Sequence, residues 1–527
     1  MVTQDEVFAS GNSAHIWQKY CGFLDLSTEQ FMRLQAGLLL EQIDQIAASP
    51  LARKLMPSRP RTVEEFRRLT PLTTYADYAP DLSARNESAL AVKPASWVCT
   101  SGRGGSIKWI PWTETAMEIF AEAGIAAGIL ACANQKGEVR VRSGMRALAN
   151  LASPPYGSGL LCQVMIEKMG VTLMPPFAGT ETLEFAARTQ LGFKMGLRNG
   201  VDLLSSLTSV LIKMGENFSQ SSGQMKLSRG LLHPRILGRL VAAWVNCKIQ
   251  RRSLLPRDLW PIKGLIAYGM DTDLYREQLR HYWGREPLEI YAATESGTIA
   301  TQAWNKKGLT FIPYTSFYEF IPEEEWLQNR QNPRYQPSTV LLNQVQPGKR
   351  YEIVITSYYG MPFLRYRIGD LIRITSLEDK AAGIHLPQMV FVSRADDLID
   401  LAGFTRLDEK TLGAALLQTG FRYEDWTARK ESANGKNRLK LYIEPKGNTT
   451  NTVIWEEQLH QALSAISEDY RDLSRMLEYQ PLEVRLLPEG SFQRYYKDRQ
   501  QAGADLAHLK PPHMNASDLM INKLLPN

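Results

Sequence analysis

The alternation of helical and strand patterns in the middle of the chain constrains the fold most. After Pro154 the pattern predicts a helix that ends near Gly170 and then a strand over 171–174. Further helices are predicted over 180–191, 200–213 and 232–248, and buried strands over 262–268 and 288–292. Because helices that alternate with buried strands are typical of parallel sheets, we expect an α/β fold whose mostly parallel sheets are covered by helices.

Two further regions are predicted around this α/β part. Strand patterns with a period of two at 318–322, 351–357 and 371–376 indicate a strand-rich part. From Arg394 onward, mixed helix and strand signals continue over roughly 130 residues, which is enough for one small domain. We therefore expect a large N-terminal domain, residues 1–393, and a small α+β C-terminal domain, residues 394–527.

Capping signals predict the helices before the α/β part. Apolar residues at helical spacing indicate two or three helices over 12–56. Thr62 can cap a short helix that Pro71 stops, and Thr113 can cap a long helix over 114–132. Residues 139–151 are compatible with a strand or a loop.

Composition excludes several functions. The 527 residues carry 61 Lys and Arg and 55 Asp and Glu, and the basic cluster 248–252 is too short for a nucleic-acid stripe, so we interpret it as solvated surface. Five cysteines without CxxC spacing indicate reduced thiols and a cytoplasmic protein. Residues 1–25 lack a signal-peptide pattern, and Glu118 and Glu122 interrupt the most apolar helical window. We expect neither a nucleic acid nor a membrane as partner.

Residues 97–113, WVCTSGRGGSIKWIPWT, change from apolar to glycine- and hydroxyl-rich and back. Glycines leave backbone N–H groups uncovered, so that they and the hydroxyls of Thr100, Ser101 and Ser106 can face one anion. The spacing fits neither a Walker motif nor Gly-x-Gly-x-x-Gly. The stretch therefore predicts either a phosphate-binding loop or an ordinary hairpin turn.

Three other stretches carry candidate chemistry. A buried strand runs into Thr294 and Glu295, and side chains at the carboxyl end of a parallel strand lie where such sheets bind ligands. Asp370 follows Gly369 in a predicted turn before a strand, and a carboxylate suits the two hydroxyls of a ribose. Residues 393–403, SRADDLIDLAG, lie at the expected domain junction. The alternatives are a solvated turn, an ordinary Gly-Asp turn and a plain linker.

Together, the four stretches resemble the adenylate-forming superfamily, which activates carboxylates with ATP. The matching segments are TSGRGGSIK, YAATE, YRIGD and RADDLI, in that order. A narrower set resembles the acyl acid amido synthetases named for plant auxin-responsive genes: FRRLTPLTTYADY, GGSIKWIPWT, YEFIP, YEIVITS and GSFQRYYKDRQQAGADLAHLKPPH. The resemblance implies a ligase that uses ATP and Mg²⁺ to adenylate a small carboxylic acid and then transfers the acyl group to an amine, expected to be an amino acid.

The resemblance also implies the role of each site residue. Glu295 would bind Mg²⁺, Thr294 would contact the α-phosphate, and Lys510 in the mobile C-terminal domain would reach the forming acyl-adenylate. Asp370 would bind the ribose, and Arg394 would add a cation near the nucleotide. The remaining ATP-binding residues are Thr100, Ser101, Gly102, Arg103, Gly104, Gly105, Ser106, Lys108, Tyr291, Ala292 and Ala293. The acyl pocket would be lined by Tyr156, Leu160, Val164, Leu204, Leu207 and Val210.

Departures from the family pattern leave alternatives open. Arg103 stands where superfamily members usually have Thr, and it could supplement or block phosphate binding. His513 stands where Arg is usual after the lysine and prolines, and Lys497 competes with Lys510 as the catalytic lysine. A ligase that forms thioesters and a non-catalytic binding relative remain alternative functions. The acid, the amine and the choice between monomer and homodimer are not readable from the residues.

Overall fold

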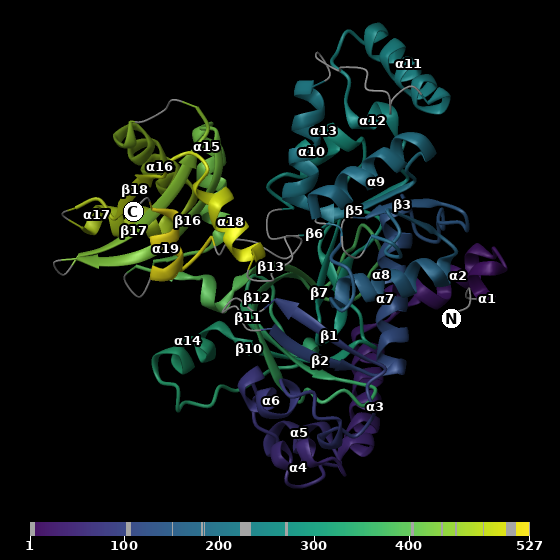
Figure 1. The fold of residues 1–527 in the computed structure, drawn as a ribbon. Coiled ribbons are helices and arrows are strands. Elements are labelled where there is room, and N and C mark those ends of the chain that lie inside the picture. The colour runs from purple at the N-terminus through teal and green to yellow at the C-terminus, as the bar shows by residue number, and fades with distance from the viewer. Residues whose placement is uncertain are drawn as a thin grey trace. The chain divides into compact units, whose positions relative to one another are not determined.

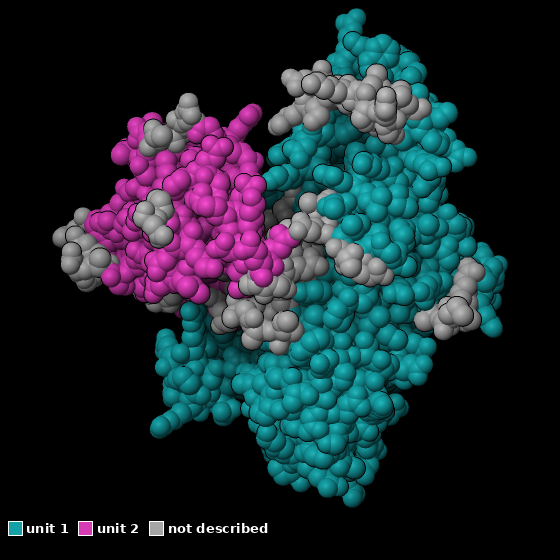
Figure 2. Space-filling model, in the orientation of Figure 1, with its two compact units in different colours: residues 1–368, 372–391 teal, residues 369–371, 392–527 magenta. Residues whose placement is uncertain are grey.

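A computed structural model describes residues 6–101, 107–149, 151–180, 183, 185–221, 233–268, 272–401, 405–433, 436–447, 451–477, 479–501 and 513–525. The chain forms two compact units (Figure 2). Unit 1 comprises residues 1–368 and 372–391, and unit 2 comprises residues 369–371 and 392–527. The boundary expected after residue 393 stays a prediction.

Unit 1 begins with helices that pack on its main core. They are α1 (Glu6–Ala9), α2 (Ser13–Cys21), α3 (Thr28–Ile46), α4 (Pro50–Leu55), α5 (Val63–Leu69) and α6 (Tyr75–Leu82). The Thr62 side chain accepts a hydrogen bond from the Glu65 backbone N–H, so it caps α5 as predicted. Ser27 and Gln30 form a capping box at the start of α3, which buries Phe31, Leu39 and Ile43 completely.

Among the described residues, eleven strands form one sheet. In spatial order they are β10 (Ser316–Pro322), β11 (Arg350–Ser357), β12 (Tyr366–Ser376), β13 (Gln388–Arg394), β9 (Leu309–Phe311), β8 (Gly297–Gln302), β7 (Leu288–Ala293), β6 (Gly264–Tyr268), β5 (Leu203–Leu207), β3 (Arg146–Ala149) and β4 (Thr172–Met174). From β4 to β7 neighbouring strands are parallel, whereas β7–β8, β8–β9, β9–β13 and β10–β11 are antiparallel. The expectation of mostly parallel sheets plus a strand-rich part is thus corrected to one large mixed sheet.

Further helices follow in unit 1, and some of them pack against its sheet (Figure 1). They are α7 (Glu114–Cys132), α8 (Gly157–Met169), α9 (Phe185–Asn199), α10 (Thr208–Ser221), α11 (Pro234–Ile249), α12 (Pro256–Leu259), α13 (Arg276–Trp283) and α14 (Glu323–Gln331). The α7 helix is capped by Thr113 and packs against α2, α8, β6 and β8. It is apolar and long enough to cross a membrane, but 72% of that window is buried inside the protein, as in a core helix.

The helix predicted over 200–213 is wrong in its first half. Residues 203–207 form β5, and α10 begins at Thr208. A short apolar run cannot be assigned to helix or strand by periodicity alone, and here the strand pairs with β3 and β6 on both sides. The helix predicted over 180–191 begins later, at Phe185.

Unit 2 is a small α/β unit built on a three-stranded sheet. β16 (Tyr423–Ala433) pairs antiparallel with β17 (Lys436–Pro445), which pairs parallel with β18 (Leu482–Leu486). Its core contains Leu412, Trp455 and Leu463. The helices are α15 (Glu409–Thr419), α16 (Thr452–Ile466), α17 (Glu468–Met476), α18 (Ser491–Gln501) and α19 (Asp518–Leu524).

Candidate functional site

The glycine-rich stretch connects two paired strands. β1 (Ser96–Ser101) and β2 (Ile107–Trp112) form an antiparallel hairpin in which Thr100 is opposite Lys108 and Ser101 is opposite Ile107. Directly opposite residues project to one face of a hairpin, so Thr100 and Lys108 share a face. The predicted phosphate-loop residues Gly102, Arg103, Gly104, Gly105 and Ser106 lie outside the described residues, so their role stays a prediction.

Hydrogen bonds to its backbone join this hairpin to the starts of α6 and α8. The Tyr75 hydroxyl donates to the Trp109 carbonyl oxygen (3.1 Å) and accepts from the Trp109 N–H (2.9 Å). The Lys108 Nζ lies 5.0 Å from the centre of the Tyr75 ring. On the other strand, the Cys99 N–H donates to the Pro155 carbonyl oxygen (3.0 Å), next to Tyr156 at the start of α8. The hairpin is therefore fixed at both of its edges.

The YAATE segment forms the end of β7 and the turn into β8. A bulge between Tyr291 and Ala292 shifts the register, and Ala293 pairs with Gly297 around a turn made by Thr294, Glu295 and Ser296. Gly297 has a φ of +65°, and a Cβ there would lie 2.5 Å from Phe120 Cγ. Glycine is required at this position because an L side chain would meet both backbone strain and a steric clash.

Side chains from distant strands hold this turn. The Trp112 Nε1–H donates to the Thr294 carbonyl oxygen (2.8 Å), and the Ser357 hydroxyl donates to the Glu295 carbonyl oxygen (2.9 Å). A would-be Cβ at Gly157 lies 3.1 Å from Thr294 Cγ2, so the start of α8 also approaches the turn closely. These contacts orient Glu295 through its backbone.

The Glu295 carboxylate is buried without a cationic partner among the described residues. Glu295 is only 7% exposed, and the Tyr366 hydroxyl donates a hydrogen bond to its Oε1 (3.0 Å). Burying a carboxylate beside a neutral donor alone is costly, and a bound cation would offset that cost. Carboxylate oxygen is a ligand that Mg²⁺ prefers, so the residue fits the predicted metal role.

The described residues contain no group of three or more His, Cys, Asp or Glu side chains that could hold a metal ion. Magnesium is commonly held by one or two carboxylates together with substrate phosphates rather than by a protein cage. Glu295 suits a site of that kind.

Tyr291 lies in β7 and is buried, with its ring 5.8 Å from that of Phe391. Ala292 is exposed and Ala293 is half-buried. The ATP-binding role of these three residues stays a prediction.

The YRIGD segment differs from its predicted form. Gly369 and Asp370 lie inside β12 rather than in a turn before a strand. Gly369 has a φ of +80°, so the glycine bends the strand without ending it. β12 lies between β11 and β13 in the sheet, so the strand continues past Gly369.

Asp370 and Arg394, both in unit 2, lie close together. Arg394 Nε is 3.5 Å from Asp370 Oδ1, across the neighbouring strands β12 and β13. The Asp370 side chain is 11% exposed and that of Arg394 is 39% exposed. The structure thus joins two residues that the sequence placed in separate motifs.

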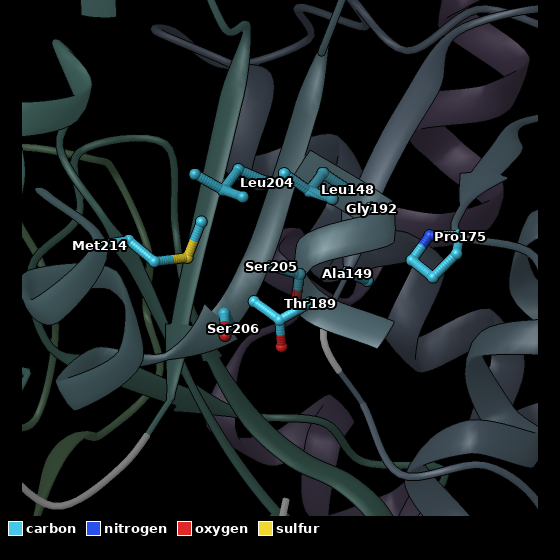
Figure 3. Close-up of a pocket in the computed structure, with 9 residues that line it drawn as sticks. All are labelled: Leu148, Ala149, Pro175, Thr189, Gly192, Leu204, Ser205, Ser206 and Met214. Atoms are coloured by element: carbon cyan, nitrogen blue, oxygen red, sulfur yellow. The ribbon is translucent and has the colours of Figure 1, made fainter. Parts of the chain in front are cut away.

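The candidate acyl-pocket residues fall on three elements. Tyr156 precedes α8, Leu160 and Val164 lie in α8, Leu204 and Leu207 lie in β5, and Val210 lies in α10. Leu204 and Leu207 were expected on a helix and are on a strand instead. Leu204 also lines a cavity at the ends of β3 and β5, with Leu148, Ser206 and Met214 (Figure 3). That cavity of about 10 Å³ has room for about one water molecule, so it cannot hold an acyl group.

The C-terminal signature ends in a buried charge cluster in unit 2. His513 Nδ1 lies 2.7 Å from Glu409 Oε1, and Nε2 lies 2.8 Å from Asp425 Oδ1. The ring stacks on Trp426 with centroids 4.5 Å apart. Burial opposes the charged ring, but Glu409 and Asp425 raise the pKa of His513 to about 10. His513 thus acts as a structural cation.

Of the two candidate lysines, Lys497 alone lies among the described residues. Lys497 lies in α18 and is exposed to solvent. Lys510 lies outside the described residues, so its choice over Lys497 stays a prediction.

Sequence reasoning missed the residues that hold the Glu295 turn. Trp112, Ser357 and Tyr366 all lie in the motifs quoted above: Trp112 is next to last in GGSIKWIPWT, Ser357 ends YEIVITS and Tyr366 begins YRIGD. Their position in family motifs was a signal, but only the fold reveals that they meet at one turn.

Three sequence models of one family match the chain in order. The GH3 family N-terminal domain matches residues 21–166, the central domain residues 309–394 and the C-terminal domain residues 409–518. The chain belongs to the GH3 family. Its Glu295 turn lies between the N-terminal and central matches.

Curated relatives of this GH3 protein include two plant synthetases. A jasmonoyl–L-amino acid synthetase of Oryza sativa subsp. japonica is 27% identical over 51% of this chain and 48% of its own length. An indole-3-acetic acid-amido synthetase of Arabidopsis thaliana is 27% identical over 50% of this chain and 47% of its own length. The chain thus spans about half the length of these relatives.

Solved structures share the fold along nearly the whole chain. The acyl acid amido synthetase AtGH3.15 in complex with 2,4-DB has a TM-score of 0.68, with 18% identity over 98% of this chain and 96% of that one. A 2-hydroxyisobutyryl-CoA ligase with a bound acyl-AMP has a TM-score of 0.63, with 14% identity over 94% and 91%. At these identities the likeness establishes the fold of the GH3 protein.

Proposed function

We propose that this GH3 protein is an acyl acid amido synthetase. It adenylates a small carboxylic acid with ATP and transfers the acyl group to the amine of an amino acid. The observation that carries the proposal is the buried Glu295 in a YAATE turn, in a chain that matches the three GH3 domains in order.

The reaction proceeds in two balanced steps. The acid carboxylate attacks the α-phosphorus of ATP, the bond to the β-phosphate oxygen breaks, and acyl-AMP and pyrophosphate form. The amine then attacks the acyl carbon, AMP leaves, and the amine loses a proton as the amide forms. The first step brings two anions together, so donors and cations that hold the phosphates in line are required.

Several residues of the chain support the first step. Thr100 and Lys108 lie opposite one another on the β1–β2 hairpin, which offers a hydroxyl and a positive charge to a phosphate. Thr294 would donate to the α-phosphate, Asp370 would accept from the ribose hydroxyls, and Lys510 would place a point charge at the forming bond.

Glu295 would hold Mg²⁺, with Tyr366 orienting its carboxylate by the hydrogen bond at Oε1. When bound, the ion would neutralise phosphate charge during pyrophosphate departure.

A first experiment tests the proposal with the full chain. Purified protein is incubated with ATP, Mg²⁺, an acid panel that includes jasmonic, indole-3-acetic and benzoic acids, and a mixture of amino acids. Acid-dependent pyrophosphate release together with an amide product in the mass spectrum supports it. Acyl transfer to coenzyme A alone would make the protein a thioester-forming ligase, and no pyrophosphate with any acid would support a non-catalytic relative.

Parallel lysine variants identify the catalytic lysine. Lys510→Ala is expected to reduce acid-dependent pyrophosphate release by roughly 10²-fold or more, since it removes a charge at the reacting phosphate. Lys497→Ala, which removes an exposed charge from α18, is expected to leave the rate within about twofold. The reverse order would reassign the catalytic lysine.

A further inference from the structure

The outer face of α11 exposes a row of large apolar side chains. Val241, Trp244, Val245 and Ile249 are all exposed, with 57% exposure for Trp244 and 75% for Ile249. Their spacing of three, four and eight residues places them on one side of the helix. The opposite side is buried through Ile236, Ala243 and Cys247. The helix therefore has two apolar faces, and the described residues of unit 1 bury only one of them.

The sequence around this face is basic throughout. Residues 217–257 contain no Asp or Glu, although the whole chain has 55 of them. Eight basic residues occur in the same stretch: Lys226, Arg229, Arg235, Arg239, Lys248, Arg251, Arg252 and Arg257. Such a stretch favours an anionic partner.

Only part of this charge is free to meet a partner. Arg252 is bound to Asp258 in an ion pair, with Nη2 2.6 Å from Oδ1. Arg235, Lys248 and Arg251 are exposed at the two ends of α11, and Lys248 Nζ lies 5.5 Å from the centre of the Trp244 ring. Positive charges thus border the apolar row at both of its ends.

We propose that α11 docks this protein on anionic lipid bilayers. An amphipathic helix with Trp and aliphatic residues on one face, bordered by Lys and Arg, is typical of helices that lie in the membrane interface. The apolar row would enter the headgroup region, while Lys248 and Arg251 would contact lipid phosphates. In Figure 1, α11 lies at an outer end of unit 1.

A second copy of the chain fits this face less well. Pairing two α11 helices would bring like charges together at both ends of the contact, which is unfavourable. The sequence-based expectation of no membrane partner rests on the missing signal-peptide pattern and on the charges that interrupt the most apolar window. The exposure of Val241, Val245 and Ile249 becomes visible only in the structure. The proposal does not depend on the catalytic function.

Vesicle flotation of the full chain tests this proposal. Binding is expected to vesicles that contain phosphatidylserine and not to vesicles of phosphatidylcholine alone, and it should weaken as salt is raised. Ile249→Asp is expected to lower the affinity at least roughly fivefold, because it places a charge in the apolar row. Val453→Asp on α16, at a residue 67% exposed, is the matched control and should bind normally.

Charge variants give a second, independent measurement. Lys248→Glu is expected to weaken binding at least roughly fivefold, and Lys93→Glu, at an exposed lysine far along the chain, should not. Equal binding of Ile249→Asp and the wild type, or no binding to phosphatidylserine vesicles, would overturn the proposal.

Two further outcomes would overturn the membrane proposal and assign the exposed face of α11 to a different partner. A dimer that dissociates on Ile249→Asp would assign the face to a second copy. A melting temperature that falls with Ile249→Asp but not with Val453→Asp would assign it to another part of the same chain.

Discussion

Two buried glutamates, one in each unit, differ in what surrounds them. Glu295 of unit 1 and Glu409 of unit 2 are 7% and 4% exposed. Glu295 accepts a hydrogen bond from the neutral Tyr366 hydroxyl, whereas Glu409 faces the cationic His513 ring at 2.7 Å. The carboxylate of Glu409 is neutralised within the protein, while among the described residues that of Glu295 is not. Burial alone therefore does not distinguish the two carboxylates, and it is the lack of a cationic partner among the described residues that fits the proposed metal role of Glu295.

The largest effect is expected for a substitution of Glu295 in unit 1. Glu295→Gln is expected to reduce acid-dependent pyrophosphate release by roughly 10²- to 10³-fold, because the amide is a poor ligand for Mg²⁺. The melting temperature should change little, since the amide oxygen can still accept from Tyr366. Steady-state kinetics and a thermal melt of the same preparation measure both. Near-normal turnover in this variant would remove Glu295 from the site.

The next largest effect concerns the cluster of His513, Glu409 and Asp425 in unit 2. His513→Ala removes one partner from a buried charge network, so the free energy of unfolding should fall by roughly 3–5 kcal/mol. Urea denaturation followed by tryptophan fluorescence measures it. His385→Ala, at a side chain 70% exposed, is the control and should change stability by less than about 0.5 kcal/mol. Equal stability of the two variants would contradict the structural role of His513.

The same cluster predicts how stability depends on pH. The pKa of His513 is raised to about 10, so its stabilising charge is fully present below the ordinary histidine pKa and is lost as pH rises through 10. Burial opposes ionisation of Asp425, but His513 holds the pKa of Asp425 below its usual range. The stabilisation that the Asp425 charge contributes is therefore lost only in acid. The stability gap between the wild type and His513→Ala should therefore narrow from pH 7 to pH 10. A constant gap over this range would contradict the assignment.

A smaller effect concerns the support of the Glu295 turn. Trp112→Phe removes the N–H that donates to the Thr294 carbonyl oxygen and keeps most of the ring packing against Phe120. The loss of one hydrogen bond is expected to cost about 1 kcal/mol of stability and a few-fold in the pyrophosphate release rate. Trp326→Phe, on α14, serves as the control for ring substitution, and equal kinetics of the two variants would argue against this support.

The sequence predicted the elements whose signals are local. Thr62 and Thr113 cap their helices as expected, because a cap depends on a side chain and a backbone group three residues away. Gly170 ends α8 in a left-handed conformation, as its position after the helical pattern indicated. The order of the motifs also identified the family.

Contacts between distant segments could not be predicted. The strand at 203–207 is decided by pairing with β3 and β6, and the position of Gly369 inside β12 by the strands on either side. Trp112 is 182 residues from Thr294, and Ser357 is 62 residues from Glu295. No local pattern encodes such distances, so the support of the site, and the cation that neutralises Glu409, emerge only with the fold.

A crystal structure of the protein with ATP, Mg²⁺ and a non-reactive analogue of the acid would test the proposed role of Glu295. We expect a magnesium ion about 2.1 Å from a Glu295 carboxylate oxygen and bound to phosphate oxygens of the nucleotide. A nucleotide bound away from the 294–296 turn, or a metal ion with no contact to Glu295, would contradict it.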